Sequence, residues 1–227
     1  MNVQRLALIR HGDYAQRAKT PSALQPYPLT AEGTAEVRAQ ARAFGDWLAG
    51  SGWWLRSDIH CSTLLRAWQT ADIYRQELAS FFTESPSVNS FSALCERSVG
   101  AVANLSVGEI EGIVAQDPRL APLPVGWKSA SHFRLPFEGA ESLLEAGERV
   151  AQHLQALPSA ADGQIQLVVG HGASIRHACY HLNVISFGDI KRLSMFHGHP
   201  VVFERQAVGW RRLYGNWKHR QAADPLD

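Results

Sequence analysis

The sequence lacks the features that mark secreted and membrane proteins. It has only three cysteines, an odd number spaced far apart, so a disulfide framework is not expected; they are Cys61, Cys95 and Cys179. No apolar run approaches the roughly 20 residues needed to cross a bilayer. The apolar stretch at 6–9 is too short for the hydrophobic core of a signal peptide. We therefore expect a soluble, cytoplasmic protein with no membrane partner.

An excess of charge of one sign is also absent. The 22 Lys and Arg residues balance 21 Asp and Glu residues, for a net charge of +1 with His neutral. Such a chain has no overall field to attract nucleic acid, so an anion must be bound locally. Hydrophobic residues make up 45% of the sequence and charged residues 19%, which is typical of a globular protein. Without repeats or linkers, the 227 residues predict one domain over 1–227.

Strands and helices are predicted to alternate outside residues 83–138. The apolar runs at 5–9 and 165–169 show no period of two, which is typical of strands buried on both faces. Thr30 is suited to cap a helix that Gly50 would end, because apolar residues between them recur every three or four positions. Similar patterns predict helices at 63–81, 140–157 and 174–182, and strands at 58–61, 200–205 and 210–214.

This alternation predicts an α/β fold, a three-layer sandwich with a mostly parallel central sheet and helices on both faces. Residues 83–138 break the pattern, because the periodicity weakens and five of the eleven prolines fall there. We interpret them as an irregular insertion on the substrate side of the domain. Within it, Trp127 and Phe133 are expected to form a small satellite core, while Lys128 and Arg134 offer charge to an anionic leaving group.

The strongest signal inside the chain is a repeated context. A His-Gly pair follows a predicted buried strand at 11–12 and again at 171–172. Parallel strands end at the same sheet edge, where ligands bind, and glycine lets the backbone turn and approach a ligand closely. Arg10 directly precedes the first His-Gly pair, and Arg66 lies in the first turn of the predicted helix that follows the strand at 58–61. With the two histidines, these arginines would form a binding site for a dianion such as phosphate. The residues expected to bind the phosphate are Arg10, Arg66, Gly12 and Gly172.

Metal binding is the rival interpretation, because the chain has ten histidines. His177 and His181 lie four apart on a predicted helix, and His197 and His199 flank a glycine. No carboxylate or cysteine completes either pair at the spacing of a metal site. We interpret these four as surface or pocket-wall residues and expect no metal and no other cofactor.

Segments along nearly the whole chain resemble the motifs of the histidine phosphatase superfamily, specifically its phosphoglycerate-mutase-like branch. The sequence Arg10-His11-Gly12 resembles the family signature, and Gly170-His171-Gly172-Ala173-Ser174 resembles the second histidine motif. The other similar segments, in the family's order, are 29–33, 61–71, 94–97 with Gly100, 141–142 with Arg149, and 198–200 with 203–204.

The resemblance implies a role for each matching residue. His11 would be the nucleophile that takes the phosphoryl group as a phosphohistidine, with Arg10, Arg66 and His171 around that group. Glu96 would give a proton to the leaving oxygen, for which burial would have to raise its pKa. Phosphoryl transfer depends mainly on positioning and on neutralising charge, which fixed arginines supply without a metal.

Departures from the family pattern separate hydrolysis from mutase chemistry. The glycolytic mutases have a serine where this chain has Tyr14, and a His and a Tyr where it has Ser98 and Val99. Val107 and Ser129 stand where they have cations. A mutase must hold a bisphosphorylated intermediate while it reorients, and the groups for that task are largely missing here. Net hydrolysis is therefore favoured.

Three hypotheses remain open at this stage. The first is a metal-independent phosphomonoesterase that acts on a small phosphorylated metabolite and releases inorganic phosphate. The second is a phosphoglycerate mutase-type phosphoryl transfer. The third is a non-catalytic phosphate-binding regulatory module, which would not need a nucleophilic histidine. Loops at 13–29 and 97–137 are expected to select the substrate, and the oligomeric state does not follow from the sequence.

Overall fold

The computed structural model describes residues 3–21, 23–158 and 163–221. Its centre is a seven-stranded sheet in the order β4-β3-β5-β1-β7-β8, with β2 paired to β5 outside this path. The neighbours from β4 to β1 run parallel, whereas β7 and β8 add an antiparallel edge. The strands are β1 (Arg5–Arg10), β2 (Trp54–Leu55), β3 (Asp58–Ser62), β4 (Ser87–Phe91), β5 (Gln164–Gly170), β7 (Pro200–Arg205) and β8 (Trp210–Tyr214).

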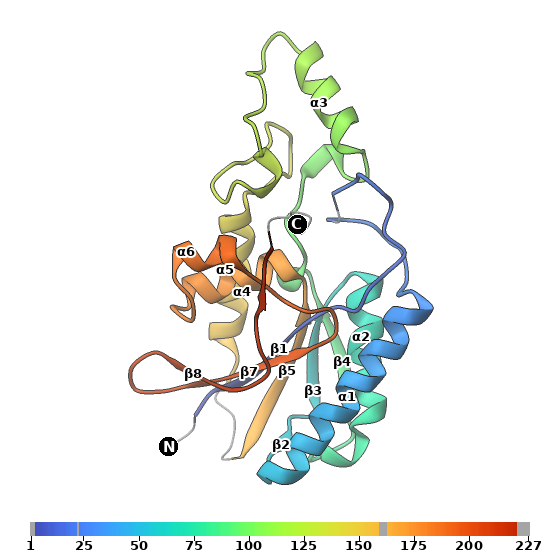
Figure 1. Cartoon of the computed structure of the whole chain (residues 1–227), viewed down its shortest axis with the longest axis vertical. Helices are drawn as coiled ribbons and strands as arrows, with labels where there is room; N and C mark the ends of the chain where they lie inside the picture. Colours follow the sequence, from blue (N-terminus) through green and yellow to red (C-terminus); the bar gives the residue numbers. More distant parts are fainter. Residues whose placement is uncertain (1–2, 22, 159–162, 222–227) are drawn as a thin grey trace.

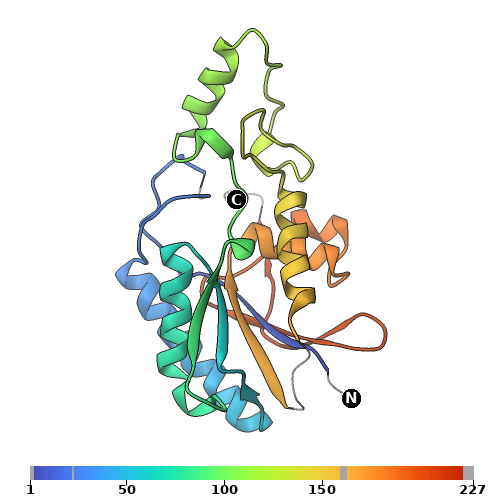
Figure 2. The ribbon, with the colours of Figure 1, turned by 180° about the vertical axis from the view of Figure 1, so that it is seen from behind.

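Helices cover both faces of the sheet, as Figures 1 and 2 show from opposite sides. The helices α1 (Ala31–Ser51) and α2 (Leu65–Glu77) pack on one face. The helices α4 (Leu143–Ala156) and α5 (Gly172–His181) pack on the other, and α6 (Phe187–Arg192) lies beside α5. The predicted three-layer α/β fold with a mostly parallel sheet is confirmed.

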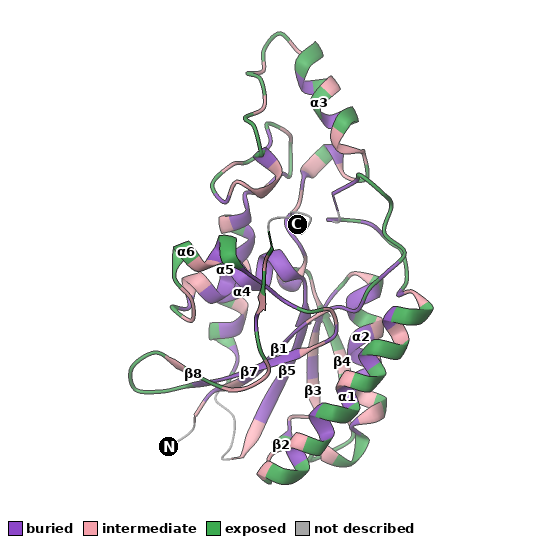
Figure 3. Ribbon diagram, in the orientation of Figure 1, coloured by how far each residue is buried: buried purple, intermediate pink, exposed green. Residues whose placement is uncertain are grey.

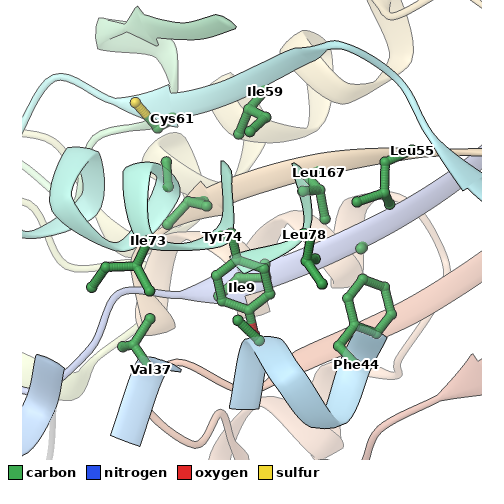
Figure 4. Packing of buried hydrophobic residues seen from close by; sticks show 14 of the residues in the cluster. Ile9, Val37, Phe44, Leu55, Ile59, Cys61, Ile73, Tyr74, Leu78 and Leu167 are labelled. Atoms are coloured by element: carbon green, nitrogen blue, oxygen red, sulfur yellow. The ribbon is translucent and has the colours of Figure 1, made fainter. Parts of the chain in front are cut away.

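The side chains of β1 point alternately into two separate hydrophobic cores. Ile9 points into a cluster with Phe44 of α1 and Tyr74 of α2, which Figure 4 shows from close by. Leu6 and Leu8 face the opposite side and pack with the α4 and α5 cluster. Figure 3 shows the resulting buried sheet between partly exposed helices. Burial on both faces explains why the strand sequence has no alternation of polar and apolar residues.

Several predicted helix ends were wrong. Gly50 lies inside α1, which ends at Ser51 and is capped by Gly52, whose φ of 69° is in the left-handed region that glycine adopts without strain. The helix predicted over 63–81 begins at Leu65 and ends at Glu77, followed by a 3₁₀ turn. The helix predicted from 140 begins at Leu143, because Ser142 and Glu145 form a capping box. The one predicted from 174 begins at Gly172, directly after His171.

The stretch at 83–138 contains more regular structure than the sequence predicts. It begins with β4, the parallel edge strand of the main sheet, and includes α3 (Val107–Gln116), which Ser106 caps. The prediction missed β4 because its sequence, Ser-Val-Asn-Ser-Phe, is mostly polar and exposed. The satellite core is confirmed, because Trp127 is buried in a cluster against which Phe133 packs. In Figure 1 the part of this region that includes α3 forms the projection above the sheet, whereas β4 lies within the sheet.

The last part of the chain forms three short elements that the prediction also missed. The strands β6 (Leu193–Ser194) and β9 (Lys218–His219) pair antiparallel and form a small second sheet. Helix α6 starts at a capping box of Ser186 and Asp189. In the part of the chain that the structure describes, no helix combines the length and the apolar character of a membrane span.

Candidate active site

The site lies where three parallel strands end. β1 pairs with β5 so that Arg10 lies opposite Gly170, and the residues that follow are His11 and His171. Their ring centroids are 5.0 Å apart. The predicted meeting of the two His-Gly pairs at one sheet edge is therefore present in the structure, and β3 ends beside them at Ser62.

Arg66 connects the two histidines. It lies in the first turn of α2 and is fully buried. Its Nε donates a hydrogen bond to Nε2 of His11 at 3.1 Å, and its Nη2 lies 3.2 Å from Nδ1 of His171. Nη1 donates to the carbonyl oxygen of Gln25 at 2.9 Å. These bonds hold a positive charge between the imidazoles, where it can meet a phosphate dianion.

Hydrogen bonds fix the tautomer of His11. Its Nδ1 lies 2.7 Å from the carbonyl oxygen of Gly12, which only accepts, so the ring proton is on Nδ1 and Nε2 keeps its lone pair. Burial, the neighbouring His171 and the charges of Arg66 and Arg10 lower the pKa of His11 well below 6.5. The imidazole is therefore neutral at neutral pH, which nucleophilic attack requires.

His171 takes the opposite tautomer. A guanidinium only donates, so Nδ1 accepts from Arg66, and Nε2 carries the proton and donates to Oγ of Ser62 at 2.8 Å. Burial, followed by the charges of Arg66 and Arg10, lowers its pKa well below 6.5. Ser62 has no role among the sequence predictions, although it lies in the segment that resembles the family motif around Arg66.

Two glycines shape the rim of the site. A Cβ at Gly172 would lie 3.0–3.3 Å from the side chain of Arg10, so the glycine makes room for this guanidinium, whose Nη1 donates to the carbonyl of Met195. A Cβ at Gly12 would lie 2.5 Å from Val37. The N–H of Gly12 donates to Oγ1 of Thr70, so its backbone serves packing here, and its contact with phosphate stays a prediction.

Glu96 lies beside the second histidine motif. It is buried, and its carboxylate accepts hydrogen bonds from the backbone N–H groups of Arg97, Ala173 and Ser174, the last two in the first turn of α5. It also lines a small cavity of about 20 Å³ with Arg97 and Lys128. The structure therefore places this carboxyl at the side of the site to which the 97–137 loop contributes.

Two further aromatic side chains reach the site. The ring of buried Tyr14 lies 4.4 Å from Cζ of Arg66 and 5.4 Å from the His11 ring. The ring of His197 lies 5.7 Å from that of His11. From the sequence, Tyr14 stands out only as a departure from the mutases, and His197 is expected at the surface or in a pocket wall. An isolated parallel bridge between His197 and Arg10 brings His197 to the site, which spacing along the chain does not reveal.

The histidines of the other pair, His177 and His181, each bond to groups outside the pair; Nε2 of His181 lies 3.1 Å from the carbonyl oxygen of Leu144. His177 is buried, with Nδ1 bonded to the carbonyl of Ala173 and Nε2 to Oγ of Ser131, and it lines a cavity. It is thus a pocket-wall residue and not a surface one. Over the described ranges, no group of three or more His, Cys, Asp or Glu side chains is placed to hold a metal ion.

Comparison with known proteins identifies the family. The model of the histidine phosphatase superfamily (branch 1) matches residues 6–218. The chain belongs to the histidine phosphatase superfamily. Within this superfamily it is 30% identical, over 88% of both chains, to 2,3-bisphosphoglycerate-dependent phosphoglycerate mutase 1 of Latilactobacillus sakei. A mutase of Methylobacterium sp. is 29% identical over 89% of this chain and 91% of its own.

Solved structures of the superfamily share the fold. A mycobacterial glucosyl-3-phosphoglycerate phosphatase matches with a TM-score of 0.65 at 19% identity, covering 92% of this chain and 97% of its own. The protein YhfR of Bacillus stearothermophilus matches with a TM-score of 0.67 at 20% identity, covering 92% and 95%. The recognition of the family from its motifs is confirmed, and with it a phosphatase or mutase as the class of enzyme.

Proposed function

We propose that this superfamily member is a metal-independent phosphomonoesterase that hydrolyses a small phosphorylated metabolite through a phosphohistidine on His11. The observation that carries the proposal is the state of His11. Its Nδ1 proton is held by the Gly12 carbonyl, its Nε2 lone pair is free of a proton, and the Arg66 guanidinium lies 3.1 Å from that nitrogen. The proposed nucleophile and the positive charge that would bind the phosphoryl group therefore lie side by side.

When the phosphoryl group binds, the N–H of Arg66 Nε turns from Nε2 of His11 to a phosphoryl oxygen, which frees the lone pair of Nε2. In the first step, Nε2 attacks phosphorus, the N–P bond forms, and the P–O bond to the leaving group breaks. Arg10, Arg66 and His171 surround the phosphoryl oxygens and neutralise their charge in the transition state. Glu96, in its protonated form, gives its proton to the leaving oxygen, which departs as an alcohol. The products of this step are the alcohol, the phosphohistidine and the Glu96 carboxylate.

In the second step, water attacks the phosphohistidine. The carboxylate of Glu96 takes one proton of the water, the P–N bond breaks, and inorganic phosphate leaves with His11 neutral again. The backbone N–H bonds from Ala173 and Ser174 suit the carboxylate form that this step needs. Glu96 thus returns to its starting protonation state, and no metal enters either step.

The composition of the site supports net hydrolysis over mutase chemistry. The ring of Tyr14 fills space beside His11 and Arg66 where the mutases have a serine. Ser98, Val99 and Val107 provide no charge for a second phosphate. The second candidate function is nevertheless a mutase, because the sequence relatives compared above bear that name. A mutase would require a bisphosphorylated primer and would conserve the total amount of phosphoester.

The test is hydrolysis of an aryl phosphate in the presence of EDTA. We expect release of inorganic phosphate by the wild type, no dependence on a primer, and loss of at least about 10³-fold in His11→Ala. His199→Ala is the matched control, because His199 is half-buried on the same edge and bonds Glu36 instead of the site. Unchanged activity in His11→Ala would contradict the proposal. Phosphate transfer only in the presence of a bisphosphorylated primer would favour the mutase.

A further inference from the structure

Ser62 bonds the ring nitrogen of His171 that Arg66 does not contact. It is the last residue of β3 and is fully buried, and its Oγ lies 2.8 Å from Nε2 of His171. Resting on the phosphatase function proposed above, we propose that Ser62 is a positioning residue for His171. Its hydroxyl accepts the proton on Nε2, so that Nδ1 faces the phosphoryl group and takes up a proton from it.

The hydrogen bonds of Ser62 make it an acceptor toward His171. The backbone N–H of Leu64 donates to Oγ of Ser62 at 3.3 Å, and the hydroxyl proton of Ser62 is donated to Sγ of Cys95, also at 3.3 Å. A hydroxyl has one proton and two lone pairs, so the second lone pair is directed to His171. Ser62 and Arg66 therefore favour the same tautomer of His171, each from a different ring nitrogen.

The bond from Arg66 to Nδ1 of His171 does not outlast binding of the phosphoryl group. In the proposed mechanism the guanidinium of Arg66 turns to the phosphoryl oxygens, so Nδ1 of His171 then faces an oxygen instead of an N–H group. Two lone pairs in contact repel each other, whereas a proton between the nitrogen and the oxygen makes a charge-assisted hydrogen bond. The bond from Nε2 to Ser62 does not involve the phosphoryl group, so it holds the ring in the bound state.

The proton for Nδ1 comes from the phosphoryl group itself. A phosphate monoester loses its second proton with a pKa of about 6, so part of it binds near neutral pH as a monoanion with one P–O–H group. That O–H bond breaks and an N–H bond forms at Nδ1 of His171, which gives a phosphoryl dianion and an imidazolium. The proton returns to the inorganic phosphate that leaves. An imidazolium donates at both ring nitrogens, and Oγ of Ser62 is placed to accept from Nε2.

The charges around His171 oppose an imidazolium until an anion binds. The charged and titratable groups around it are Arg66 of α2, Arg10 and His11 at the end of β1, Arg149 of α4, and Glu96 beside the first turn of α5. Burial and then the three arginines lower the pKa of His171 well below 6.5 in the free protein. A bound phosphoryl group brings negative charge among these arginines and offsets their effect. The bond to Ser62 adds to this stabilisation of the imidazolium.

The experiment measures the protonation of His171 by ¹⁵N NMR of the histidine side chains in the intact protein. Spectra are recorded near neutral pH without and with saturating inorganic phosphate, and the signals of His171 are those missing from His171→Asn. In the wild type we expect a neutral ring with its proton on Nε2, and protons on both nitrogens once phosphate is bound. In Ser62→Ala the ring should stay neutral with phosphate. Protons on both nitrogens in phosphate-bound Ser62→Ala, or a neutral ring in the phosphate-bound wild type, would overturn the proposal.

Steady-state hydrolysis of aryl phosphate measures the consequence for the reaction. We expect kcat of Ser62→Ala to fall about 10- to 100-fold, with a smaller change in KM, because the lost hydrogen bond is one to a charged group. Ser62→Thr keeps a hydroxyl and should retain both the imidazolium and most of the rate. Ser90→Ala is the matched control, because Oγ of Ser90 on the neighbouring strand β4 also bonds a cysteine, Cys61, at 3.4 Å. Its kcat should equal that of the wild type.

The two measurements separate a positioning role from a structural one. A fall in kcat of Ser62→Ala with signals of His171 like those of the wild type, both free and with phosphate, would show a structural role only and would overturn the proposal. Absence of aryl phosphate hydrolysis by the wild type would instead overturn the phosphatase function. The NMR spectra need only bound phosphate, so they decide the role of Ser62 in that case too.

Discussion

At the scale of single residues, the order of the site depends on Arg66. Its guanidinium is fully buried, bonds both imidazoles and lies 4.4 Å from the ring of Tyr14. Burial lowers the pKa of Arg66 below its ordinary value, but an arginine remains charged at any pH of interest. A buried cation needs compensation, and the π face of Tyr14 provides part of it.

Replacement of Tyr14 tests this contact. Tyr14→Leu removes the ring that packs against the guanidinium of Arg66, so this guanidinium is held less firmly. We expect kcat/KM for aryl phosphate to fall about tenfold. Tyr14→Phe keeps the ring and should stay within about twofold of the wild type. The pair is measured by steady-state kinetics with thermal unfolding as a check on folding. Equal losses in both variants would show that the hydroxyl matters and the ring contact does not.

The role of Glu96 is tested with two kinds of leaving group. In Glu96→Gln we expect hydrolysis of an alkyl phosphate to fall by about 10²–10⁴, because an alkoxide needs a proton as it departs. Hydrolysis of p-nitrophenyl phosphate should fall much less at the first step, since nitrophenolate leaves without one. Burst kinetics separates formation of the phosphohistidine from its hydrolysis. A similar loss of the burst rate for both substrates would contradict a role as proton donor.

The central residues of the site could be predicted from the sequence because each lies directly after a strand or in the first turn of a helix. His11 and His171 each follow a predicted buried strand, which was enough to predict that they lie close together. In the structure, the parallel pairing of β1 and β5 places them side by side. Tyr14 and His197 could not be placed in this way, because the position of Tyr14 depends on the path of a loop and that of His197 on an isolated bridge to Arg10. The catalytic and phosphate-binding roles stay predictions.

At the scale of elements, the packing of α4 on α5 holds the His171 turn. Gly147 is in the middle of α4, and a Cβ there would lie 2.3 Å from Cβ of His177 and 2.6 Å from its carbonyl carbon. Such overlap cannot be relieved by a side-chain rotation, so the helices would have to separate. The glycine therefore sets the distance between the two helices.

We expect Gly147→Ala to lower the free energy of unfolding by about 1–3 kcal/mol, with loss of aryl phosphatase activity from the displaced α5. Gly50→Ala is the control, because Gly50 is also inside a helix but a Cβ there meets nothing within 4 Å. That change should raise the free energy of unfolding by about 0.5–1 kcal/mol. Denaturant unfolding of both variants measures the difference. Equal effects of the two substitutions on the free energy of unfolding would show that α4 and α5 accommodate a Cβ at position 147 without separating.

The spacing of apolar residues predicted the long helices and strands. It missed the elements in which few apolar residues recur at regular spacing. The strands at 200–205 and 210–214 were placed at their observed bounds. β4 and α6 were missed, since the first is an exposed edge strand and the second has only one buried residue, Ile190. Helix ends depended on caps, and the choice between Gly50 and Gly52 required the backbone angle that only the structure shows.

At the scale of the whole molecule, buried histidines link stability to pH. Burial lowers the pKa of His11 and His171 well below 6.5, and that of His177 to about 4. The unfolded chain binds protons on these groups at pH values where the folded chain does not. Their neutral forms therefore favour the folded state above pH 6.5, and this stability is lost as pH falls toward 4.

We expect the free energy of unfolding to decrease steadily between pH 6.5 and 4. His177 alone contributes about 3 kcal/mol of that decrease. Denaturant titrations across this range should show a shallower pH dependence in His177→Asn than in the wild type, whatever the change at neutral pH. His219→Asn is the control, because that side chain is exposed. An unchanged slope in His177→Asn would contradict its buried neutral state.

At this scale, we propose that the sheet, its helices and the insertion form a single domain over 1–227. The projection that includes α3 contributes Lys128 to the small cavity beside Glu96, so the region that departs most from the mutases lies where the leaving group would be. We therefore propose that the insertion selects the substrate, while residues at the sheet edge carry out the chemistry.

The most direct test of the phosphohistidine mechanism is to trap the intermediate. The wild type is mixed with ³²P-labelled aryl phosphate, denatured within the first turnover and digested under alkaline conditions that preserve phosphohistidine. Mass spectrometry should then locate the label on the peptide that contains His11, and His11→Ala should carry none. Turnover with no labelled protein, or label on His171 or Glu96 instead, would contradict the assignment of His11 as the nucleophile.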